Sequence, residues 1–406
     1  MTIDNLTRLI TRRSQSLFVE DIETHMREIN SEIKGSRILV IGGAGSIGSA
    51  TVEQILKYRP RSLHVVDQSE NGLAELVRWL RSGVDGLTID DFRTLPLDYG
   101  SQIMHQFIVE QRPYDVVLNF AALKHVRSEK DSYSLLQMID TNVVKTARIF
   151  KWLGAQDGTS CFFSVSTDKA ANPANMMGAS KRLMEHVMFS DDIRPGKKFN
   201  TTSARFANVA FSDGSLLQSF LKRYEKRQPM ALPRATRRYF ISLEEAGQIC
   251  LLSAFCGFDR LILIPKLDPS ADMCTMEDAA RMVLKYYGMK PRIYDDEHEA
   301  RRRVATDCDH GYYPLFLTEL NTSGEKPYEE FVGSEEIAVD IGFRHLMGVE
   351  YKSVAKGMIS DIVNYLELVV SSNKDAVSKE HLVEAISKVL PEFKHIETGI
   401  NLDQRM

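Results

Sequence analysis

The sequence has few of the features that mark secreted, membrane-spanning and nucleic-acid-binding proteins. It contains five cysteines in 406 residues and no CxxC pair, so neither a disulfide framework nor a metal site is expected. No apolar run approaches the ~18 residues needed to cross a bilayer, and the first residues lack the apolar core of a signal peptide. With 51 basic and 55 acidic side chains, nothing indicates a nucleic-acid partner. We therefore expect a cytoplasmic protein with no membrane contact.

The pattern of apolar and polar residues changes along the chain. Residues 1–35 are polar, with apolar residues at helical spacing, and predict an arm that packs on the main fold or contacts another subunit. From residue 36, short apolar strands alternate with helical stretches, which predicts an α/β protein with a doubly wound parallel sheet. Residues 353–395 contain two further helical patterns. There is no internal repeat and no low-complexity segment.

A glycine-rich turn follows the first predicted strand, residues 38–42. Gly42, Gly45 and Gly48 have the spacing GxxGxxG, a variant of the dinucleotide-binding fingerprint, with Ser46 and Ile47 at the start of the next helix. Missing Cβ atoms let the backbone approach a pyrophosphate, and the helix N-terminus offers N–H groups and a positive dipole end. The turn therefore predicts a dinucleotide site.

Two acidic residues extend this prediction. Asp67 ends the next strand, where a carboxylate binds the adenosine ribose 2′-hydroxyl and repels a 2′-phosphate, which favours NAD over NADP. Asp98 follows a later extended stretch and is a candidate contact of the adenine. The alternative for Asp67 is a solvent-facing aspartate beside a tight turn, and the alternative for Asp98 is a surface acid.

Three further polar segments lie at the ends of predicted strands, where open α/β sheets bind their ligands. They are residues 119–125, 166–170 and 176–181. The run STDKAANPANMMGASKRLMEH (166–186) closely resembles the UDP-N-acetylglucosamine 4,6-dehydratases of the CapD-like polysaccharide-biosynthesis group, in the extended short-chain dehydrogenase/reductase superfamily. The motifs AALKHV (121–126), DTNVVKT (140–146), RFANV (205–209), RYFISLEEA (238–246) and GEKPYEE (324–330) carry the same resemblance, in the same order.

The resemblance implies one extended unit over residues 36–345. Its Rossmann-type, NAD-binding core spans mainly 36–205, and a smaller interleaved substrate lobe spans mainly 206–345. An N-terminal helical arm (1–35) and a C-terminal helical tail (346–406) remain outside it. Members of the superfamily often dimerise through a two-helix face, so a homo-oligomer is expected, with a nucleotide sugar as its substrate.

The resemblance also implies the chemistry. Tightly bound NAD⁺ takes a hydride from C4 of the sugar, a base removes the C5 proton, an acid protonates the departing C6 hydroxyl, and the hydride returns to C6. Asp168 matches the acid, Lys169 the base, and Thr167 the partner of the C4 hydroxyl. Such a pair needs a raised aspartate pKa and a lowered lysine pKa, and adjacent residues share one substrate only where the strand ends in a turn. The alternative is a plain ion pair.

One position departs from the superfamily pattern. A Tyr-x-x-x-Lys pair normally lies on one face of a helix, with the lysine on the nicotinamide ribose. Here Lys181 is present, but Met177 occupies the tyrosine position. Some members of the resembled group share this methionine, so the C4 proton is expected to leave through Thr167 or a water, with C5 configuration retained. The alternatives are a sugar-nucleotide epimerase and an inactive NAD-binding regulator.

The resemblance places four residues near the substrate: Lys124, Asn208, Arg238 and Glu325, with Ala121 against the cofactor. For Lys124, Arg238 and Glu325, a structural or solvated role is the alternative. The family commonly has arginine where this chain has Asp213 and Thr322. Arg223, Arg234, Arg237 or one of Arg301–Arg303 is a candidate replacement, and the expected substrate is a UDP sugar first and a GDP sugar second.

Overall fold

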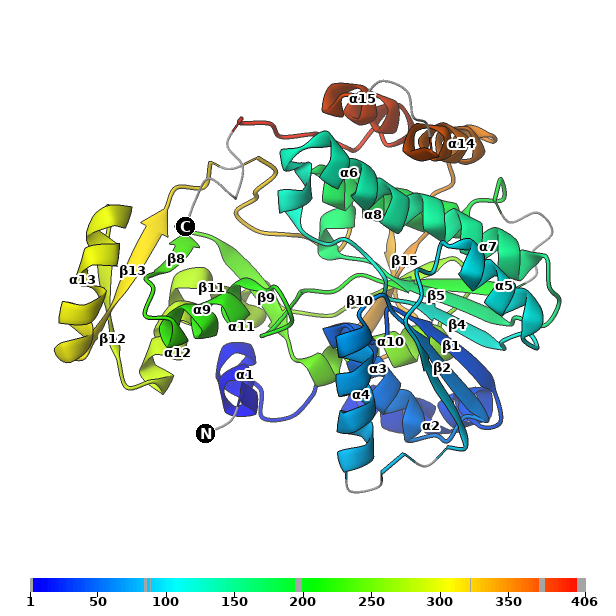
Figure 1. Ribbon diagram of the computed structural model, residues 1–406, viewed down its shortest axis with the longest axis horizontal. Coiled ribbons are helices and arrows are strands. Elements are labelled where there is room, and N and C mark those ends of the chain that lie inside the picture. Colours follow the sequence, from blue (N-terminus) through cyan, green and yellow to red (C-terminus); the bar gives the residue numbers. More distant parts are fainter. Residues whose placement is uncertain are drawn as a thin grey trace.

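A nine-stranded sheet forms the centre of the molecule (Figure 1). The computed structural model describes residues 3–83, 86–87, 89–193, 199–321, 323–371 and 377–399. The strand order is β14-β15-β10-β6-β5-β4-β1-β2-β3. The strands are β1 (Arg37–Ile41), β2 (Ser62–Val66), β3 (Asp91–Leu95), β4 (Val116–Asn119), β5 (Cys161–Val165), β6 (Asn200–Ala204), β10 (Leu261–Pro265), β14 (Ala338–Val339) and β15 (Leu346–Glu350).

The predicted doubly wound parallel sheet is confirmed. Within this sheet, neighbouring strands pair in parallel along the run β10-β6-β5-β4-β1-β2-β3. The order reverses between β1 and β4, where sheets of this type bind ligands. Strands β2, β4 and β5 are buried along their whole length, because helices cover both faces. Strands β14 and β15 add an antiparallel edge.

Two helical layers enclose this sheet (Figure 1). One contains α2 (Val19–Ile33), α3 (Ser46–Leu56), α4 (Glu70–Ser82) and α10 (Leu243–Phe255), and the other contains α5 (Gln102–Glu110), α7 (Lys145–Gly154) and α8 (Met176–Phe189). Helices α3 and α10 pack closely at Gly247, where a Cβ would lie 2.8 Å from the Ala50 carbonyl oxygen. This contact holds the helix that begins at the glycine-rich turn.

A smaller lobe lies beside the strand ends (Figure 1). It has two three-stranded sheets, in the orders β11-β9-β7 and β12-β13-β8. Because β10 of the central sheet comes between β9 and β11 in sequence, the lobe is interleaved with the core as predicted. Its elements are β7 (Asn208–Val209), β8 (Met230–Pro233), β9 (Arg237–Ile241), β11 (Met273–Thr275), β12 (Lys290–Tyr294), β13 (Tyr312–Thr318), α9 (Leu216–Glu225), α11 (Pro269–Asp272), α12 (Met276–Tyr286) and α13 (Glu297–Asp309).

The N-terminal arm consists of two helices that pack on different parts of the molecule. Helix α1 (Ile3–Thr11) buries Leu6 and Ile10 in the core of the lobe, whereas α2 buries Ile29 and Ile33 beneath the central sheet. Between them, Arg13 binds the carboxylate of Glu245 and the backbone oxygen of Phe240. The arm therefore ties the lobe to the core.

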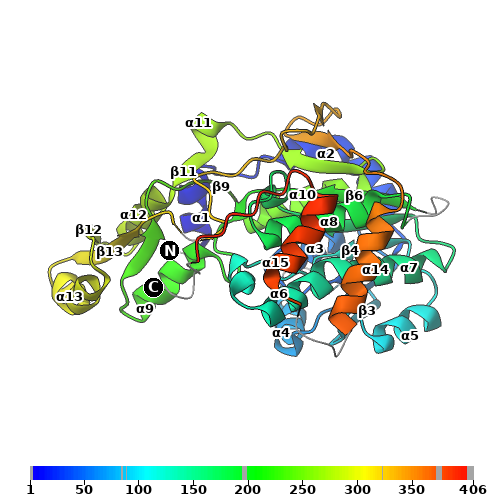
Figure 2. The same ribbon diagram turned by 90° about the horizontal axis from the view of Figure 1, so that it is seen from above.

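The C-terminal tail covers a layer of the core (Figures 1 and 2). Helices α14 (Met358–Ser371) and α15 (Lys379–Val389) lie over α6 (Ser132–Ile139), η2 (Asp140–Val144) and α8. They share one apolar cluster with these elements, which includes Leu366, Ile386 and Met177. Among the residues that the structure describes, no helix is long and apolar enough to cross a membrane.

This packing predicts a contrast between two leucines of α14. Leu366 is 0% exposed and Leu368 is 66% exposed. Leu366→Ala should lower the free energy of unfolding by ~2–5 kcal/mol through loss of buried contacts and a new cavity. Leu368→Ala should change it by less than ~0.5 kcal/mol. Urea unfolding of both variants measures the difference, and equal effects would show that α14 is not packed on the core.

Candidate active site

The glycine-rich turn is packed so closely that two of its glycines admit no side chain. Gly42 has φ +73°, and a Cβ there would lie 2.4 Å from the backbone nitrogen of Ala121, which follows β4. A Cβ on Gly48 would lie 2.4 Å from the carbonyl oxygen of Gly42. At Gly45, by contrast, the nearest atom to a Cβ is 3.5 Å away. The turn therefore keeps an open face at the N-terminus of α3, which fits a pyrophosphate.

The acids predicted for the adenosine lie at the ends of β2 and β3. Asp67 accepts hydrogen bonds from the backbone nitrogens of Ala44 and Ser69, at 3.0 and 2.9 Å, so its carboxylate lies directly beside the glycine-rich turn. Asp98 pairs with Lys145 at 2.6 Å. The placement of Asp67 fits a ribose acceptor, and the lysine partner of Asp98 was not predicted.

A sharp turn follows β5, as predicted for the acid–base pair. The strand ends at Val165, and a single 3₁₀ turn, η3 (Asp168–Ala170), begins two residues beyond Ser166. The Thr167 hydroxyl donates to Asp168 Oδ1 at 2.8 Å, and Lys169 Nζ lies 3.0 Å from the same oxygen. The turn thus brings all three side chains together, and the ion pair considered as an alternative is present.

Glu329 is a member of this cluster that the sequence analysis missed. Its Oε1 lies 3.9 Å from Lys169 Nζ, and the residue is 6% exposed. Burial raises the pKa of Glu329, and the neighbouring Asp168 raises it further against the effect of Lys169. The sequence signal for it was the pair of glutamates, Glu329 and Glu330, that ends the motif GEKPYEE. The resemblance pointed instead to the first glutamate of this motif, Glu325.

The expectation of a lowered Lys169 pKa is wrong for this structure. Burial by itself lowers the pKa of Lys169, but the carboxylates of Asp168 and Glu329 outweigh burial and raise it. Lys169 is therefore an ammonium at neutral pH in the arrangement described.

Helix α8 brings the lysine of the superfamily pair next to this turn. A Cβ on Gly178 would lie 2.5 Å from the Lys169 carbonyl oxygen, so the start of α8 packs directly on η3. Burial lowers the pKa of Lys181 to about 8, although Glu185 raises it. Met177 is buried in the apolar cluster beneath the C-terminal helices. Lys181 is therefore a buried amine one helical turn from a residue with no proton to transfer.

A buried ion network lies behind the turn that carries Asp168 and Lys169. Arg205, at the end of β6, binds the carboxylates of Glu185 on α8 and Glu336 in the loop after β13. Arg182 pairs with the same two carboxylates. The Ser166 hydroxyl donates to Glu185 at 2.6 Å, so the network reaches the residue before Thr167. It joins strand β5, helix α8 and the loop that carries Glu329.

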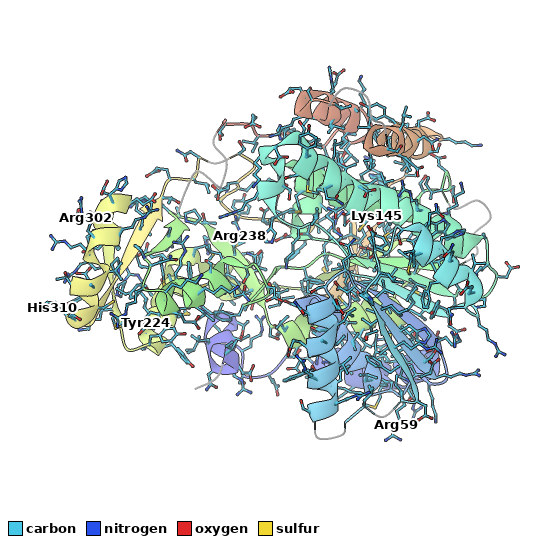
Figure 3. The ribbon with its side chains drawn as sticks, in the orientation of Figure 1. Arg59, Lys145, Tyr224, Arg238, Arg302 and His310 are labelled. Carbon is cyan, nitrogen blue, oxygen red and sulfur yellow. The ribbon has the colours of Figure 1, made fainter. Side chains whose placement is uncertain are left out.

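Arg238 holds the GEKPYEE loop in place rather than presenting a free cation. Its guanidinium donates to the backbone oxygens of Lys326 and Pro327, at 2.9 and 3.0 Å, and it lies on the side of the lobe that faces the central sheet (Figure 3). Asn208 begins β7, Lys124 is exposed after β4, and Glu325 is half-buried in the loop. The charge of Arg238 lies near enough to Lys169 and Glu329 to lower the pKa of each.

The C-terminal tail also reaches this loop, which the sequence did not predict. The backbone nitrogens of Lys394 and Ile396 donate to the oxygens of Pro173 and Ala174, just before α8. The nitrogen of Gly324 donates to the Ile396 oxygen at 3.0 Å. Residues 394–396 therefore join the segment just before α8 to the loop of Glu329.

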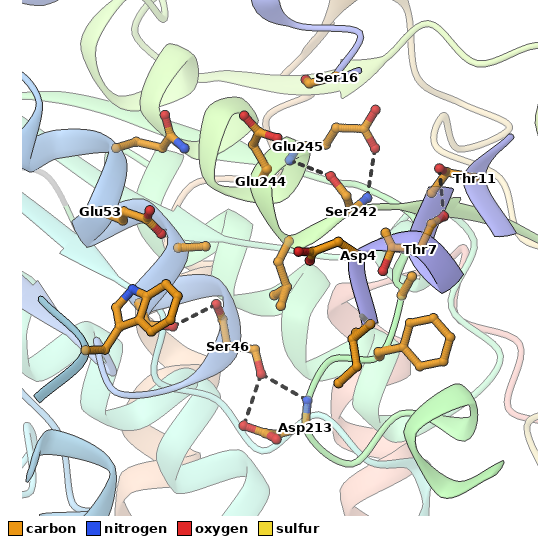
Figure 4. A pocket seen from close by; sticks show the side chains of 18 of the residues that line it. Asp4, Thr7, Thr11, Ser16, Ser46, Glu53, Asp213, Ser242, Glu244 and Glu245 are labelled. Carbon is orange, nitrogen blue, oxygen red and sulfur yellow. Dashed lines mark hydrogen bonds between the residues drawn. The ribbon is translucent and has the colours of Figure 1, made fainter. Parts of the chain in front are cut away.

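The structure describes one of the two positions at which the family commonly has arginine, that of Asp213. Asp213 accepts from the Ser46 hydroxyl at 3.1 Å, which links the loop after β7 to the start of α3, at the edge of a cavity of about 920 Å³ lined by α1, α3, α4 and α10 (Figure 4). Thr322 lies outside the described residues. Of the candidate replacements, Arg301 pairs with Glu297, and Arg302 lies at the outer end of the lobe (Figure 3).

The turn geometry predicts different effects for two alanine variants. Gly42→Ala should destabilise the fold, because the left-handed backbone costs ~1–2 kcal/mol before the clash with Ala121 is added. Gly45→Ala should fold normally, since its φ of −72° is unstrained, but its methyl group should obstruct a bound dinucleotide. Thermal unfolding and nucleotide released from the purified protein measure the two effects. A Gly45→Ala protein that keeps a full complement of nucleotide would contradict the assignment of the turn.

Comparison with known proteins agrees with the geometry. The model of the family described as polysaccharide biosynthesis protein matches residues 38–350. An uncharacterized membrane protein of Methanocaldococcus jannaschii is 31% identical over 77% of this chain and 84% of its own length. A UDP-N-acetylglucosamine 4,6-dehydratase (inverting) of Campylobacter jejuni is 25% identical over 82% of this chain and 98% of its own.

A solved structure shows the same fold. Pen from Bacillus thuringiensis superposes with a TM-score of 0.64 at 22% identity, over 89% of this chain and 98% of that one. The family match, the sequence motifs and the doubly wound sheet lead to one conclusion: the chain belongs to the polysaccharide biosynthesis protein family, in the extended short-chain dehydrogenase/reductase superfamily.

Proposed function

We propose that the protein is an NAD-dependent sugar-nucleotide 4,6-dehydratase. UDP-N-acetylglucosamine is the favoured candidate substrate, and GDP-N-acetylglucosamine is the second candidate. The product would be a 4-keto-6-deoxy sugar nucleotide for surface glycan synthesis. The observation that carries the proposal is the cluster of Thr167, Asp168 and Lys169, because elimination of water needs an acid and a base within reach of adjacent carbons. C4 oxidation alone, as in an epimerase, gives no role to such a pair.

The residues of the core fit NAD. The open face at Gly45 and the amides of Ser46 and Ile47 would hold the pyrophosphate, Asp67 the adenosine ribose, and Lys181 the nicotinamide ribose. NAD bound there would supply the acceptor for the hydride of C4 and its donor to C6. The carboxylate of Asp67 favours an unphosphorylated ribose.

The hydrogen bonds of Thr167 supply a route for the C4 proton in the absence of a tyrosine. The Thr167 hydroxyl already donates to Asp168 Oδ1. If it accepts the C4 hydroxyl proton while passing its own to Asp168, then Asp168 becomes the acid that protonates the C6 oxygen. The proton lost at C4 thus leaves in the water formed at C6, and Lys169 takes the C5 proton and returns it.

This proposal predicts the products of a direct assay. The purified protein, incubated separately with UDP- and GDP-N-acetylglucosamine, should yield a product lighter by one water, detected by mass spectrometry. Lys169→Ala should lower turnover by at least ~100-fold and keep bound NAD. Lys352→Ala, a change at an exposed lysine that pairs with Glu335, serves as the control. An unchanged mass with an altered sugar spectrum would indicate epimerisation, and no reaction on either sugar would contradict the proposal.

A further inference from the structure

Lys169 lies between two buried carboxylates. Its Nζ is 3.0 Å from Asp168 Oδ1 and 3.9 Å from Glu329 Oε1, and both acids are nearly inaccessible to water. An ammonium flanked by two anions holds its proton firmly. Removal of a C5 proton, however, requires a neutral amine. The site therefore needs a group that takes the proton of Lys169 before the elimination.

Asp168 does not suit that role. The oxygen that faces Lys169 also accepts the Thr167 hydroxyl, and in the proposed reaction it receives the proton of the C4 hydroxyl. If Asp168 were already protonated by Lys169, the C4 proton would have no acceptor. Among the described residues, Glu329 is the other carboxylate within ion-pair distance of Lys169 Nζ.

The surroundings of Glu329 suit a group that alternates between charged and neutral forms. It faces Lys169 and Asp168 of η3, Arg238 of β9 and Lys326 of its own loop. Burial raises the pKa of Glu329, so its neutral form costs less than that of an exposed carboxylate. The bonds from Arg238 to the backbone of this loop, together with the C-terminal residues bound at Gly324, fix the loop beside Lys169.

We propose that Glu329 is a positioning residue that accepts the proton of Lys169, which frees Lys169 to act as base at C5 and leaves Asp168 free for the C4 proton. In this step Lys169 Nζ moves from 3.9 Å to hydrogen-bond distance of Glu329 Oε1. An N–H bond of the ammonium then breaks, an O–H bond forms on Glu329, and the pair becomes neutral with no change of net charge. The proposal rests on the dehydratase function. Every proton in the reaction then has an acceptor: Asp168 receives the C4 proton, Lys169 the C5 proton, and Glu329 keeps the proton of Lys169 through the remaining steps.

The test compares Glu329→Gln with Glu330→Gln. The first substitution keeps the shape of the side chain but removes its ability to accept a proton, whereas Glu330 is exposed and bonded to Asn172. In the Glu329 variant, kcat at neutral pH should fall by roughly two orders of magnitude, with KM unchanged. Turnover should recover as the pH rises, because Lys169 then loses its proton to solvent. Reduced cofactor should accumulate, since C4 oxidation precedes the blocked step. The Glu330 variant should behave as wild type, and Glu329→Asp should restore activity at neutral pH.

A second measurement is independent of turnover. In protein labelled with ¹³C-lysine, the Lys169 signal is identified by its loss in Lys169→Arg and titrated with pH. Loss of one of its two anionic neighbours should shift the Lys169 titration downward in Glu329→Gln and leave it unchanged in Glu330→Gln. Wild-type kcat and an unshifted titration in Glu329→Gln would overturn the inference while dehydration by the wild type upheld the function. A shifted titration in a protein that dehydrates no sugar nucleotide would overturn the function and the proposed role of Glu329 together.

Discussion

The arrangement of the proposed active site depends on the buried ion network around Arg205. This side chain is 0% exposed, and a buried guanidinium is tolerated only when carboxylates surround it. Its partners, Glu185 and Glu336, come from helix α8 and from the loop beyond β13. Removing one partner of such a network costs ~3–5 kcal/mol, so the end of β6, helix α8 and this loop hold one another in a single arrangement. Arg182 extends the network to Glu392 in the C-terminal tail.

These segments carry the side chains of the proposed reaction. Helix α8 carries Lys181, the loop carries Glu329, and Ser166 joins the network one residue before Thr167. Acid–base groups of opposite roles must be held within hydrogen-bond reach of one another and of the substrate. A network of fixed charges achieves this better than apolar packing, because each bond has a required direction and length. The site is therefore built on the rigid core, and the smaller lobe contributes through Arg238 and the loop it holds.

Local features of the fold and site could be predicted from the sequence, and long-range ones could not. The glycine-rich turn, the parallel strands and the turn after β5 follow from residues within a short window, so their prediction from pattern succeeded. The charge state of Lys169 was predicted wrongly because Glu329 reaches it from a distant loop, and no local pattern reports that approach. Arg238 was expected near the substrate but binds backbone oxygens of that loop. The helical spacing of apolar residues predicted the helices of the arm and the tail. It did not predict which part of the protein each apolar face packs against.

The most direct test of the account uses UDP-N-acetylglucosamine that carries deuterium at C4. If the protein is a 4,6-dehydratase whose nicotinamide moves one hydride within each turnover, the product should lose one water and carry the deuterium at C6. This is read by mass spectrometry and by the NMR signal of the new methyl group. Deuterium that remains at C4, with no loss of water, would contradict the account, as would a product whose methyl group contains no deuterium.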